Sequence, residues 1–270
     1  MKKIAAFLFA VALAARADEP QVPKSELILD LDADKGVEVV EGKVISWQNQ
    51  VEFKARDFKA TREAGKPALR KDVAALHGHS SVVFRHQELQ NYDEDAFDLL
   101  ITGGGYTWIA VMCAYKQNPQ LPDVNCFFGN LKNGGNFEGI WGNVNDDNSV
   151  WIGSRNGVTF GRWNSDNPKV TGPKLEENRH YIITARMAAG TGTVPLELFV
   201  NGKLAASLPF PVNPKANSSK MAVGQERDAT NHPGKEAFDG EIARLLIWQR
   251  PLTDRELAEA SLALQQTYGL

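Results

Sequence analysis

The chain has 270 residues, with 30 Lys and Arg against 33 Asp and Glu, so its formal net charge at pH 7 is -3. A mildly acidic chain lacks the excess positive charge that binds nucleic-acid phosphates, so nucleic acid is excluded as an expected partner. The length fits one large all-β domain, which buries enough apolar surface to fold without disulfide staples.

The first segment, residues 1–17, has the pattern of a secretory signal peptide. Two lysines precede an apolar run from Ile4 to Ala15, and Ala15-Arg16-Ala17 is a small-x-small cleavage site. The run is too short to cross a bilayer, which takes about 20 residues, and no later segment is expected to span a membrane. We therefore expect export to the periplasm or the extracellular space after cleavage near Ala17. Residues 18–270 then carry a net charge of 27 − 33 = -6.

Residues 18–270 show almost entirely the pattern of short β-strands. Each predicted strand is rich in β-branched and aromatic residues and is bounded by Gly, Asn, Asp or Pro. The predicted strands are 26–32, 43–48, 81–85, 106–115, 126–131, 148–153, 158–163, 180–187, 195–200, 203–208, 220–225 and 241–248. Val200-Asn201-Gly202-Lys203 predicts a two-residue type I′ hairpin. This series favours an antiparallel sandwich, and the absence of a sequence repeat or linker indicates one domain.

One helix is predicted, at the C-terminus. Thr253 and Glu256 form a capping box, and Leu252 with Leu257 forms a hydrophobic staple. Gly269 ends the helix. Apolar side chains recur on one helical face at Leu257, Ala260, Leu264 and Tyr268. This pattern indicates a helix that docks on a sheet.

The order of these elements resembles the laminin-G-like domains of the concanavalin-A-like lectin/glucanase superfamily, and most of all the exported domains of planctomycete-type bacteria. The most specific features are the F-x-G-x-I-A strand at 238–243 followed by R-P-L-T-D-x-E-L at 250–257, and the F-V-N-G hairpin at 199–202. The likeness covers nearly all of residues 18–270. It implies an all-β, two-sheet antiparallel jelly-roll sandwich with a C-terminal helix. It also implies carbohydrate binding, adhesion or accessory roles, although one fold hosts many functions.

Two carboxylates, Asp239 and Glu241, lie where the last predicted strand begins. In a strand they would share one face about 7 Å apart, a separation that suits an inverting glycosidase. The glucanases of the superfamily carry a Glu-x-Asp-x-x-Glu motif, whereas Glu241 is followed by Ile-Ala-Arg-Leu-Leu. We therefore interpret both carboxylates as polar residues of a structural strand and assign no catalytic residue.

Candidate ligand-binding residues gather in 133–166. Sugar sites use aromatic rings that stack on C–H-rich sugar faces, with polar side chains that bind the hydroxyls. Two tryptophans lie beside Gly/Asn-rich turns, where functional residues concentrate, whereas Trp47, Trp108, Trp151 and Trp248 lie in strand patterns and are expected in the core. The candidate glycan-binding residues are Trp141, Trp163, Asn143, Asn145, Asn164, Asp166 and Arg162. The alternative is that the Asn and Asp residues only form turns.

Asp146, Asp147 and Asn148 could supply oxygen ligands to Ca²⁺, the only cofactor that the sequence suggests. Turn formation is again the alternative.

Cys113 and Cys126 flank a Pro-containing segment between two apolar runs. They could form a disulfide across a hairpin, or they could be two separate buried thiols, and both alternatives stay open.

The sequence favours an exported, non-catalytic lectin-like domain that binds a glycan or a cell-envelope partner through loops at one edge of a sandwich. One alternative is a polysaccharide-active enzyme, a glycosidase or a lyase. The residue types that a lyase uses to neutralise a uronate and move a proton are present at Arg162, Arg227, His232, Asp228 and Tyr181. The other alternative is a structural envelope protein without a ligand. No oligomeric state is predicted.

Overall fold

A computed structural model describes residues 20–118, 124–132, 137–159, 164–226 and 235–270. The predicted signal peptide, 1–17, therefore lies outside the described residues, as do Arg162 and Trp163. In the described part, 17 strands join into one continuous hydrogen-bonded network. The named strands pair antiparallel throughout, as the hairpin-rich sequence predicts.

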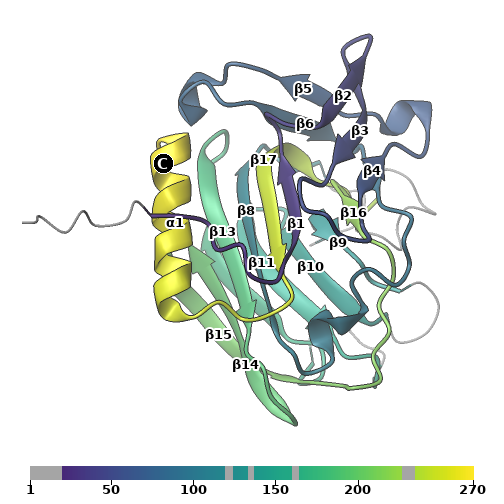
Figure 1. Ribbon diagram of the computed structural model, residues 1–270, viewed down its shortest axis with the longest axis vertical. Coiled ribbons are helices and arrows are strands. Elements are labelled where there is room, and N and C mark those ends of the chain that lie inside the picture. Colours follow the sequence, from purple (N-terminus) through teal and green to yellow (C-terminus); the bar gives the residue numbers. More distant parts are fainter. Residues whose placement is uncertain (1–19, 119–123, 133–136, 160–163, 227–234) are drawn as a thin grey trace, which may run out of the picture.

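One layer of the network carries the C-terminal helix on its outer face (Figure 1). Its strands, in spatial order, are β1 (Leu27–Asp32), β17 (Asp239–Trp248), β8 (Tyr106–Ala114), β13 (His180–Met187), β14 (Thr193–Val200) and β15 (Lys203–Pro211). We call it the helix-side layer. The turn between β14 and β15 is the predicted hairpin, because Val200 pairs with Lys203 while Asn201 and Gly202 have φ of 49° and 75°.

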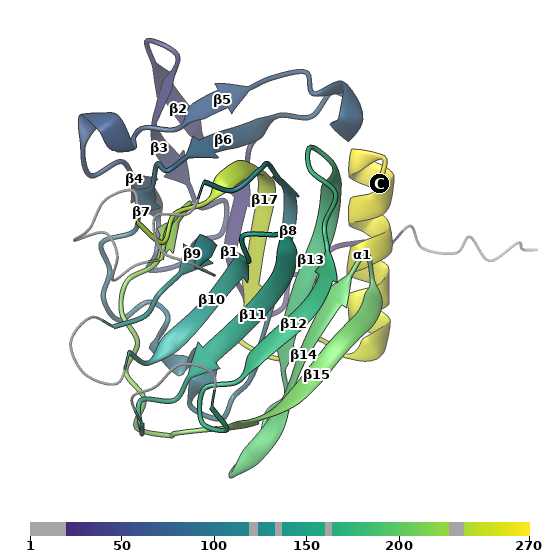
Figure 2. The same ribbon diagram turned by 180° about the vertical axis from the view of Figure 1, so that it is seen from behind.

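The opposite layer faces the viewer in Figure 2. Its strands, in spatial order, are β12 (Lys169–Lys174), β11 (Ser149–Arg155), β10 (Gly139–Val144), β9 (Asn125–Gly129), β16 (Ala222–Val223) and β7 (Leu89–Gln90). Short strands at one end then connect the layers. They are β4 (Asp57–Lys59), β3 (Lys43–Gln48), β2 (Val37–Val40), β5 (Ala68–Arg70) and β6 (Ser81–Arg85), and β6 pairs with β17.

The two-sheet sandwich that the sequence predicts is therefore one sheet folded over on itself. The end strands, β12 and β15, lie against each other (Figure 2), but no ladder joins them within the described residues. The network is nearly closed and barrel-like because β3 to β7 carry the hydrogen bonding from one layer to the other, while β2 pairs only with β3. We call the open line between β12 and β15 the seam. Three short 3₁₀ helices also occur, at Glu63–Gly65, Ala74–Leu76 and Asp98–Ile101.

The main core fills the space between the layers. Trp47 and Trp108 are fully buried there, and the Trp108 ring meets Phe128 edge-on at a centroid distance of 5.0 Å. A second apolar cluster lies between the helix-side layer and α1 and includes Trp248. The prediction that these three tryptophans are core residues is confirmed.

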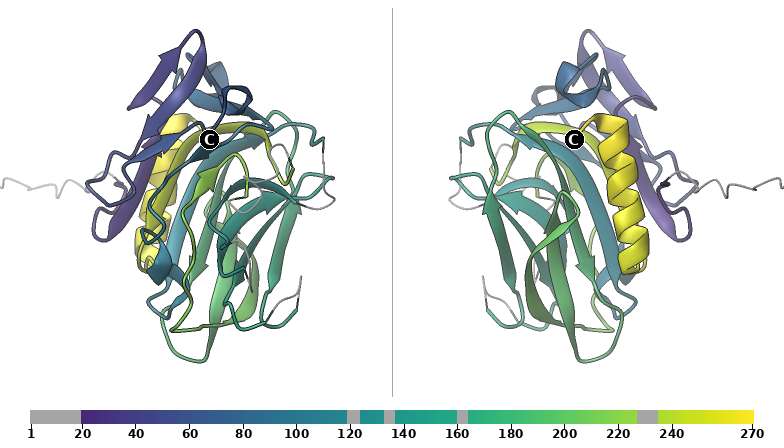
Figure 3. Two further views of the ribbon diagram at one scale, coloured as in Figure 1. Left: turned by 90° about the vertical axis from the view of Figure 1, so that its right-hand side faces the viewer. Right: turned by 90° about the vertical axis from the view of Figure 1, so that its left-hand side faces the viewer.

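Helix α1 (Asp254–Tyr268) lies along the outside of the helix-side layer (Figure 3). The capping box is present, since the Thr253 side chain accepts a hydrogen bond from the Glu256 backbone and the Glu256 side chain accepts one from the Thr253 backbone. Gly269 ends the helix at a left-handed φ of 69°. The predicted apolar face packs on the sheet as expected. No helix in the described ranges is both long and apolar enough to cross a bilayer.

Three strands of the opposite layer were not predicted: the two-residue β7, β10 and β12. The glycines of β10 and β12 suggest loops, but each glycine makes room for a neighbour. A Cβ on Gly142 would lie 2.3 Å from Cζ of Phe127, and a Cβ on Gly172 would lie 2.7 Å from Cδ2 of Leu198. The predicted strand 158–163 is not seen in its described part, since 158–159 lie outside strands.

Replacing Thr253 by Ala removes the acceptor that caps the Glu256 backbone N–H. We expect the free energy of unfolding to fall by about 1 kcal/mol, the usual cost of losing an N-cap. Urea denaturation followed by circular dichroism measures it. Thr267→Ala is the control, because that exposed hydroxyl only contacts the Ala263 carbonyl of the same helix. An equal loss in both variants would contradict the capping argument.

Candidate functional site

Of the two tryptophans predicted to bind a sugar, Trp141 is within the described residues. It lies on the outer face of the opposite layer. Along β10, Ile140 and Val144 enter the main core, and alternation places Trp141 and Asn143 on the other side. Trp141 lies within a strand rather than beside a turn, and it is only 3% exposed. Its indole meets Trp151 of β11 edge-on at 5.7 Å. Trp151, predicted in the core, is buried in this separate outer cluster.

Polar side chains surround these two indoles. Arg155 places its guanidinium carbon 5.6 Å from the Trp141 ring, and Lys169 places Nζ 4.7 Å from the Trp151 ring. Lys169 also donates to Asn145 Oδ1 at 2.7 Å. Neither polar atom of the buried Asn143 amide meets a hydrogen-bond partner in the part of the chain that is described. We call this set the tryptophan face.

A groove opens at the seam, beside the tryptophan face. Its volume is about 240 Å³, and it is lined by Asn164, Ser165, Pro168, Lys169, Leu208 and Pro209. We call it the seam groove. Lys169 belongs to both the groove and the tryptophan face, so the two are continuous. Leu208 is 39% exposed although it belongs to a strand, and it gives the groove an apolar wall. A second hollow of about 310 Å³ lies along the same Leu208–Pro209 segment, against Thr193–Pro195.

The structure brings together some of the predicted binding residues and separates others. Asn164 lines the groove, while its Oδ1 accepts the backbone N–H groups of Asp166 and Asn167, both at 2.9 Å. Asp166 accepts the Thr159 hydroxyl at 2.9 Å. Asn145 reaches the groove only through its bond with Lys169. These hydrogen bonds fix the backbone of residues 164–167 beside the groove. Arg162 and Trp163 lie outside the described residues.

The proposed calcium ligands form the turn between β10 and β11. Asp147 Oδ1 accepts the backbone N–H and the hydroxyl of Ser149, at 2.9 and 2.7 Å, and these bonds lower the pKa of Asp147. Asp146 Oδ1 accepts from Asn125 at 3.2 Å. Asn148 adopts a left-handed φ of 66° and donates to the Tyr115 carbonyl. Turn chemistry accounts for all three positions, and calcium binding stays a prediction.

The two cysteines are not bonded to each other. Cys113 lies on β8 in the helix-side layer, and Cys126 lies on β9 in the opposite layer; both are buried thiols. The disulfide alternative is wrong, because the two thiols lie in different layers and do not face each other across a hairpin. The alternative of two separate thiols holds.

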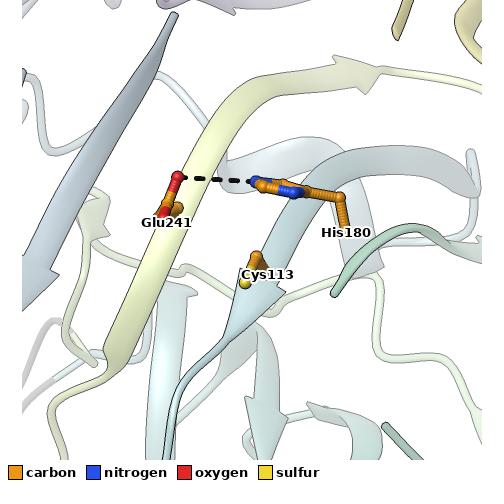
Figure 4. Close-up of side chains that lie close together, drawn as sticks. All are labelled: Cys113, His180 and Glu241. Carbon is orange, nitrogen blue, oxygen red and sulfur yellow. Dashed lines mark ion pairs between the residues drawn. The ribbon is translucent and has the colours of Figure 1, made fainter. Parts of the chain in front are cut away.

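Around Glu241 the structure shows a polar cluster that sequence reasoning missed. Glu241 of β17 pairs in register with Cys113 of β8, which pairs in register with His180 of β13. Directly paired residues project to the same face of a sheet. Figure 4 shows the three side chains gathered from these three neighbouring strands. Only the strand register could have revealed the cluster, because the three residues are far apart in the sequence.

Glu241 is 1% exposed and is held from several sides. Oε1 accepts from Arg70 Nη1 at 2.8 Å and from the Tyr115 hydroxyl, while Oε2 accepts from Ser81 Oγ at 2.5 Å. His180 Nε2 lies 3.5 Å from Oε2. Burial alone would raise the pKa of Glu241, but the contacts with His180, Ser81 and Tyr115 outweigh it and lower the pKa to about 2. The side chain is therefore a fixed carboxylate.

This arrangement does not resemble an accessible catalytic site. Burial, with the nearby Glu241 charge, raises the pKa of the Cys113 thiol to about 12, so the thiol is not an activated nucleophile. Asp239 makes its own contact, 3.0 Å from His86 Nε2, so the two carboxylates serve separate partners.

Of the residues named for a lyase, the structure describes only Tyr181. Its side chain packs in the main core, and its hydroxyl accepts the Glu176 backbone N–H at 3.2 Å. Arg162, Arg227, Asp228 and His232 lie outside the described residues.

Glu241→Gln tests the buried carboxylate. A folded-state pKa of about 2, against 4.5 for the free group, stabilises the fold above pH 4.5, and this stabilisation is lost as the pH falls toward 2. At pH 7 we expect the variant to lose roughly 3 kcal/mol of unfolding free energy, and the deficit should shrink below pH 4.5. Urea titrations from pH 7 to 3 measure it, with the exposed Glu177→Gln as control. A pH-independent deficit would contradict this assignment.

Alkylation tests the two thiols. Unreduced protein, unfolded in denaturant with iodoacetamide, should gain two adducts by mass spectrometry, because both cysteines are thiols. Native protein should gain none in a short reaction, since both side chains are buried. Unfolded protein that takes up no adduct would show that a disulfide had formed.

Comparison with solved structures places the fold among carbohydrate-active and binding proteins. A sialidase from Trypanosoma rangeli, in complex with 2,3-difluorosialic acid, aligns with a TM-score of 0.58 and 12% identity over 91% of this chain. This chain spans 34% of that sialidase, about a third of its length. Domain 4 of an extracellular arabinanase from Geobacillus stearothermophilus, in complex with arabinotriose, aligns with a TM-score of 0.55 and 17% identity, covering 87% of this chain and 98% of that domain.

The binding domain of botulinum neurotoxin serotype D/C aligns with a TM-score of 0.56 and 11% identity, over 89% of this chain and 52% of the toxin chain. At such identities these likenesses show the fold alone. No curated protein matches the chain. The family model described as the concanavalin A-like lectin/glucanases superfamily matches residues 96–258, more than half of the chain. The chain belongs to the concanavalin A-like lectin/glucanase superfamily.

Proposed function

We propose that the protein is an exported, non-catalytic carbohydrate-binding domain with a jelly-roll fold, and that a sugar binds in the seam groove. The observation that carries the proposal is the composition of this groove. Exposed Leu208 and two prolines form an apolar side, and Asn164, Ser165 and Lys169 form a polar side. A pyranose or furanose ring has the same division, with a C–H face and a hydroxyl edge.

The size of the groove favours one sugar unit of a longer chain. Its volume, about 240 Å³, is below the roughly 300–1,000 Å³ typical of pockets that enclose a drug-sized ligand. The adjoining hollow along Leu208 and Pro209 offers room for a neighbouring unit. We therefore expect an oligosaccharide to lie along the seam and to bind more tightly than its monosaccharide.

The comparisons support a carbohydrate as the ligand. The arabinanase domain that this chain resembles over nearly its whole length was solved with arabinotriose, and the Trypanosoma rangeli sialidase was solved with 2,3-difluorosialic acid. Lys169 adds a positive charge to the groove, so an acidic sugar would gain an ion pair that a neutral sugar lacks. A panel of neutral and uronate oligosaccharides separates these two classes.

The groove lining supports binding without catalysis. Glycoside hydrolysis uses two carboxyl groups that flank the bond to be broken. The described residues that line the groove include no carboxylate. Asp166, which follows the lining residues Asn164 and Ser165, accepts the Thr159 hydroxyl and donates its backbone N–H to Asn164.

Leu208→Ala tests the groove as a sugar site. Losing the apolar wall should weaken oligosaccharide binding about fivefold to tenfold, equivalent to roughly 1 kcal/mol. Leu204→Ala is the matched control, because Leu204 is on the same strand and 57% exposed but does not line the groove. Isothermal titration calorimetry after a glycan-array screen provides the measurement.

A second variant, Ser165→Trp, should fill the groove and abolish binding while leaving the thermal unfolding temperature nearly unchanged. Equal affinities of the Leu208, Leu204 and Ser165 variants would place any sugar site elsewhere. A wild-type protein that binds none of the array glycans would contradict the proposed function itself.

A further inference from the structure

The cluster around Glu241 contains a set of potential metal ligands. Cys113 offers a sulfur, His180 a ring nitrogen and Glu241 a carboxylate oxygen, and these three atoms all lie within 4.8 Å of one another. All three residues are buried. Sulfur, imidazole nitrogen and carboxylate oxygen are the donors that Zn²⁺ and similar divalent transition metals take from proteins.

The spacing of two of these donors fits a shared cation better than a direct contact. His180 Nε2 and Glu241 Oε2 are 3.5 Å apart, longer than the 2.7–3.2 Å of a good N–H···O hydrogen bond. Two ligands that each lie about 2.0–2.1 Å from a tetrahedral ion are separated by roughly 3.3 Å. The observed distance is close to that separation.

His180 supplies an independent indication. Its side chain is 3% exposed, and neither ring nitrogen meets a hydrogen-bond partner among the described residues. Buried polar groups are nearly always satisfied, and a buried imidazole without a partner costs free energy. A metal bound to the lone pair of one nitrogen would satisfy that group where the surrounding side chains do not.

The remaining contacts of Glu241 suit a second shell of ligand-supporting groups. Arg70 and Tyr115 hold Oε1, while Oε2 accepts from Ser81 Oγ at 2.5 Å and also lies 3.5 Å from His180 Nε2. Ligating carboxylates are commonly oriented by such hydrogen bonds. The positive charge of Arg70 opposes a cation, but the thiolate and the carboxylate together supply two negative charges beside it.

We propose that Cys113, His180 and Glu241 bind a divalent transition-metal ion of the zinc class. The three ligands come from adjacent strands of the helix-side layer, so the ion would join β17, β8 and β13 on the face that also carries α1. Binding converts the Cys113 thiol to a thiolate and releases its proton to solvent, so affinity rises with pH. The site is separate from the seam groove, and this inference stands without the sugar-binding proposal.

Cobalt provides the first test, because a thiolate bound to Co²⁺ gives an intense near-ultraviolet charge-transfer band. The full chain is unfolded under reducing conditions with a chelator, freed of metal, and refolded with Co²⁺, since the buried site needs the chain to open. We expect one equivalent to bind, and Zn²⁺ to displace it. The band should be absent from Cys113→Ser and retained in Cys126→Ser, the matched control on the opposite layer.

His180→Gln should weaken Zn²⁺ binding at least about tenfold and remove the rise in unfolding temperature that Zn²⁺ produces in the wild type. If Cys113→Ser does not fold, X-ray absorption of the zinc-loaded wild type decides, since the proposal requires one sulfur in the first coordination shell. A wild type that binds no metal after refolding, a charge-transfer band that survives in Cys113→Ser, or a shell without sulfur would each overturn the proposal.

Discussion

The rest of the structure depends on the burial of β17 from both sides. Its edges pair with β8 on one side and with β1 and β6 on the other, and one face packs into the main core while the other packs under α1. A strand in that position must satisfy every backbone group by pairing and must be almost wholly apolar. Of its three charged residues, Asp239, Glu241 and Arg244, Glu241 is the most deeply buried, and its charge has to be balanced by groups brought from other strands.

The need to balance that charge explains the placement of the N-terminal strands at one end of the molecule. β5 supplies Arg70 and β6 supplies Ser81, and both side chains bind the Glu241 carboxylate. β8 and β13 complete the surroundings with Cys113 and His180. Removing one partner of such a buried charge costs several kcal/mol, because the remaining charge stays in the interior. The polar cluster therefore also fixes which strands can lie beside β17, since a one-residue register slip would turn Glu241 to the opposite face.

Features with local causes could be predicted from the sequence, and features with distant causes could not. The capping box at Thr253 and the hairpin at Asn201–Gly202 depend on residues within a few positions, and both are present as predicted. β10 was missed because Gly142 reads as a loop residue until the Phe127 ring is placed beside it. In the same way, Asp239 and Glu241 suggested a pair along one strand, while the actual partners lie on other strands. The predicted glycan ligands stay a prediction, and the seam groove beside Asn164 could not be predicted because it depends on how β12 and β15 lie, which no local pattern indicates.

The proline content of the end strands has a consequence for how the sheet terminates. β12 contains Pro173, and β15 contains Pro209 and Pro211, so each strand lacks a backbone N–H donor at these positions. No ladder joins the two strands in the described part of the chain, and the groove beside Leu208 lies along this open line. The same missing donors make β15 a poor template for a strand from another molecule. An open edge that would otherwise invite pairing with another copy of the chain is thus protected against it.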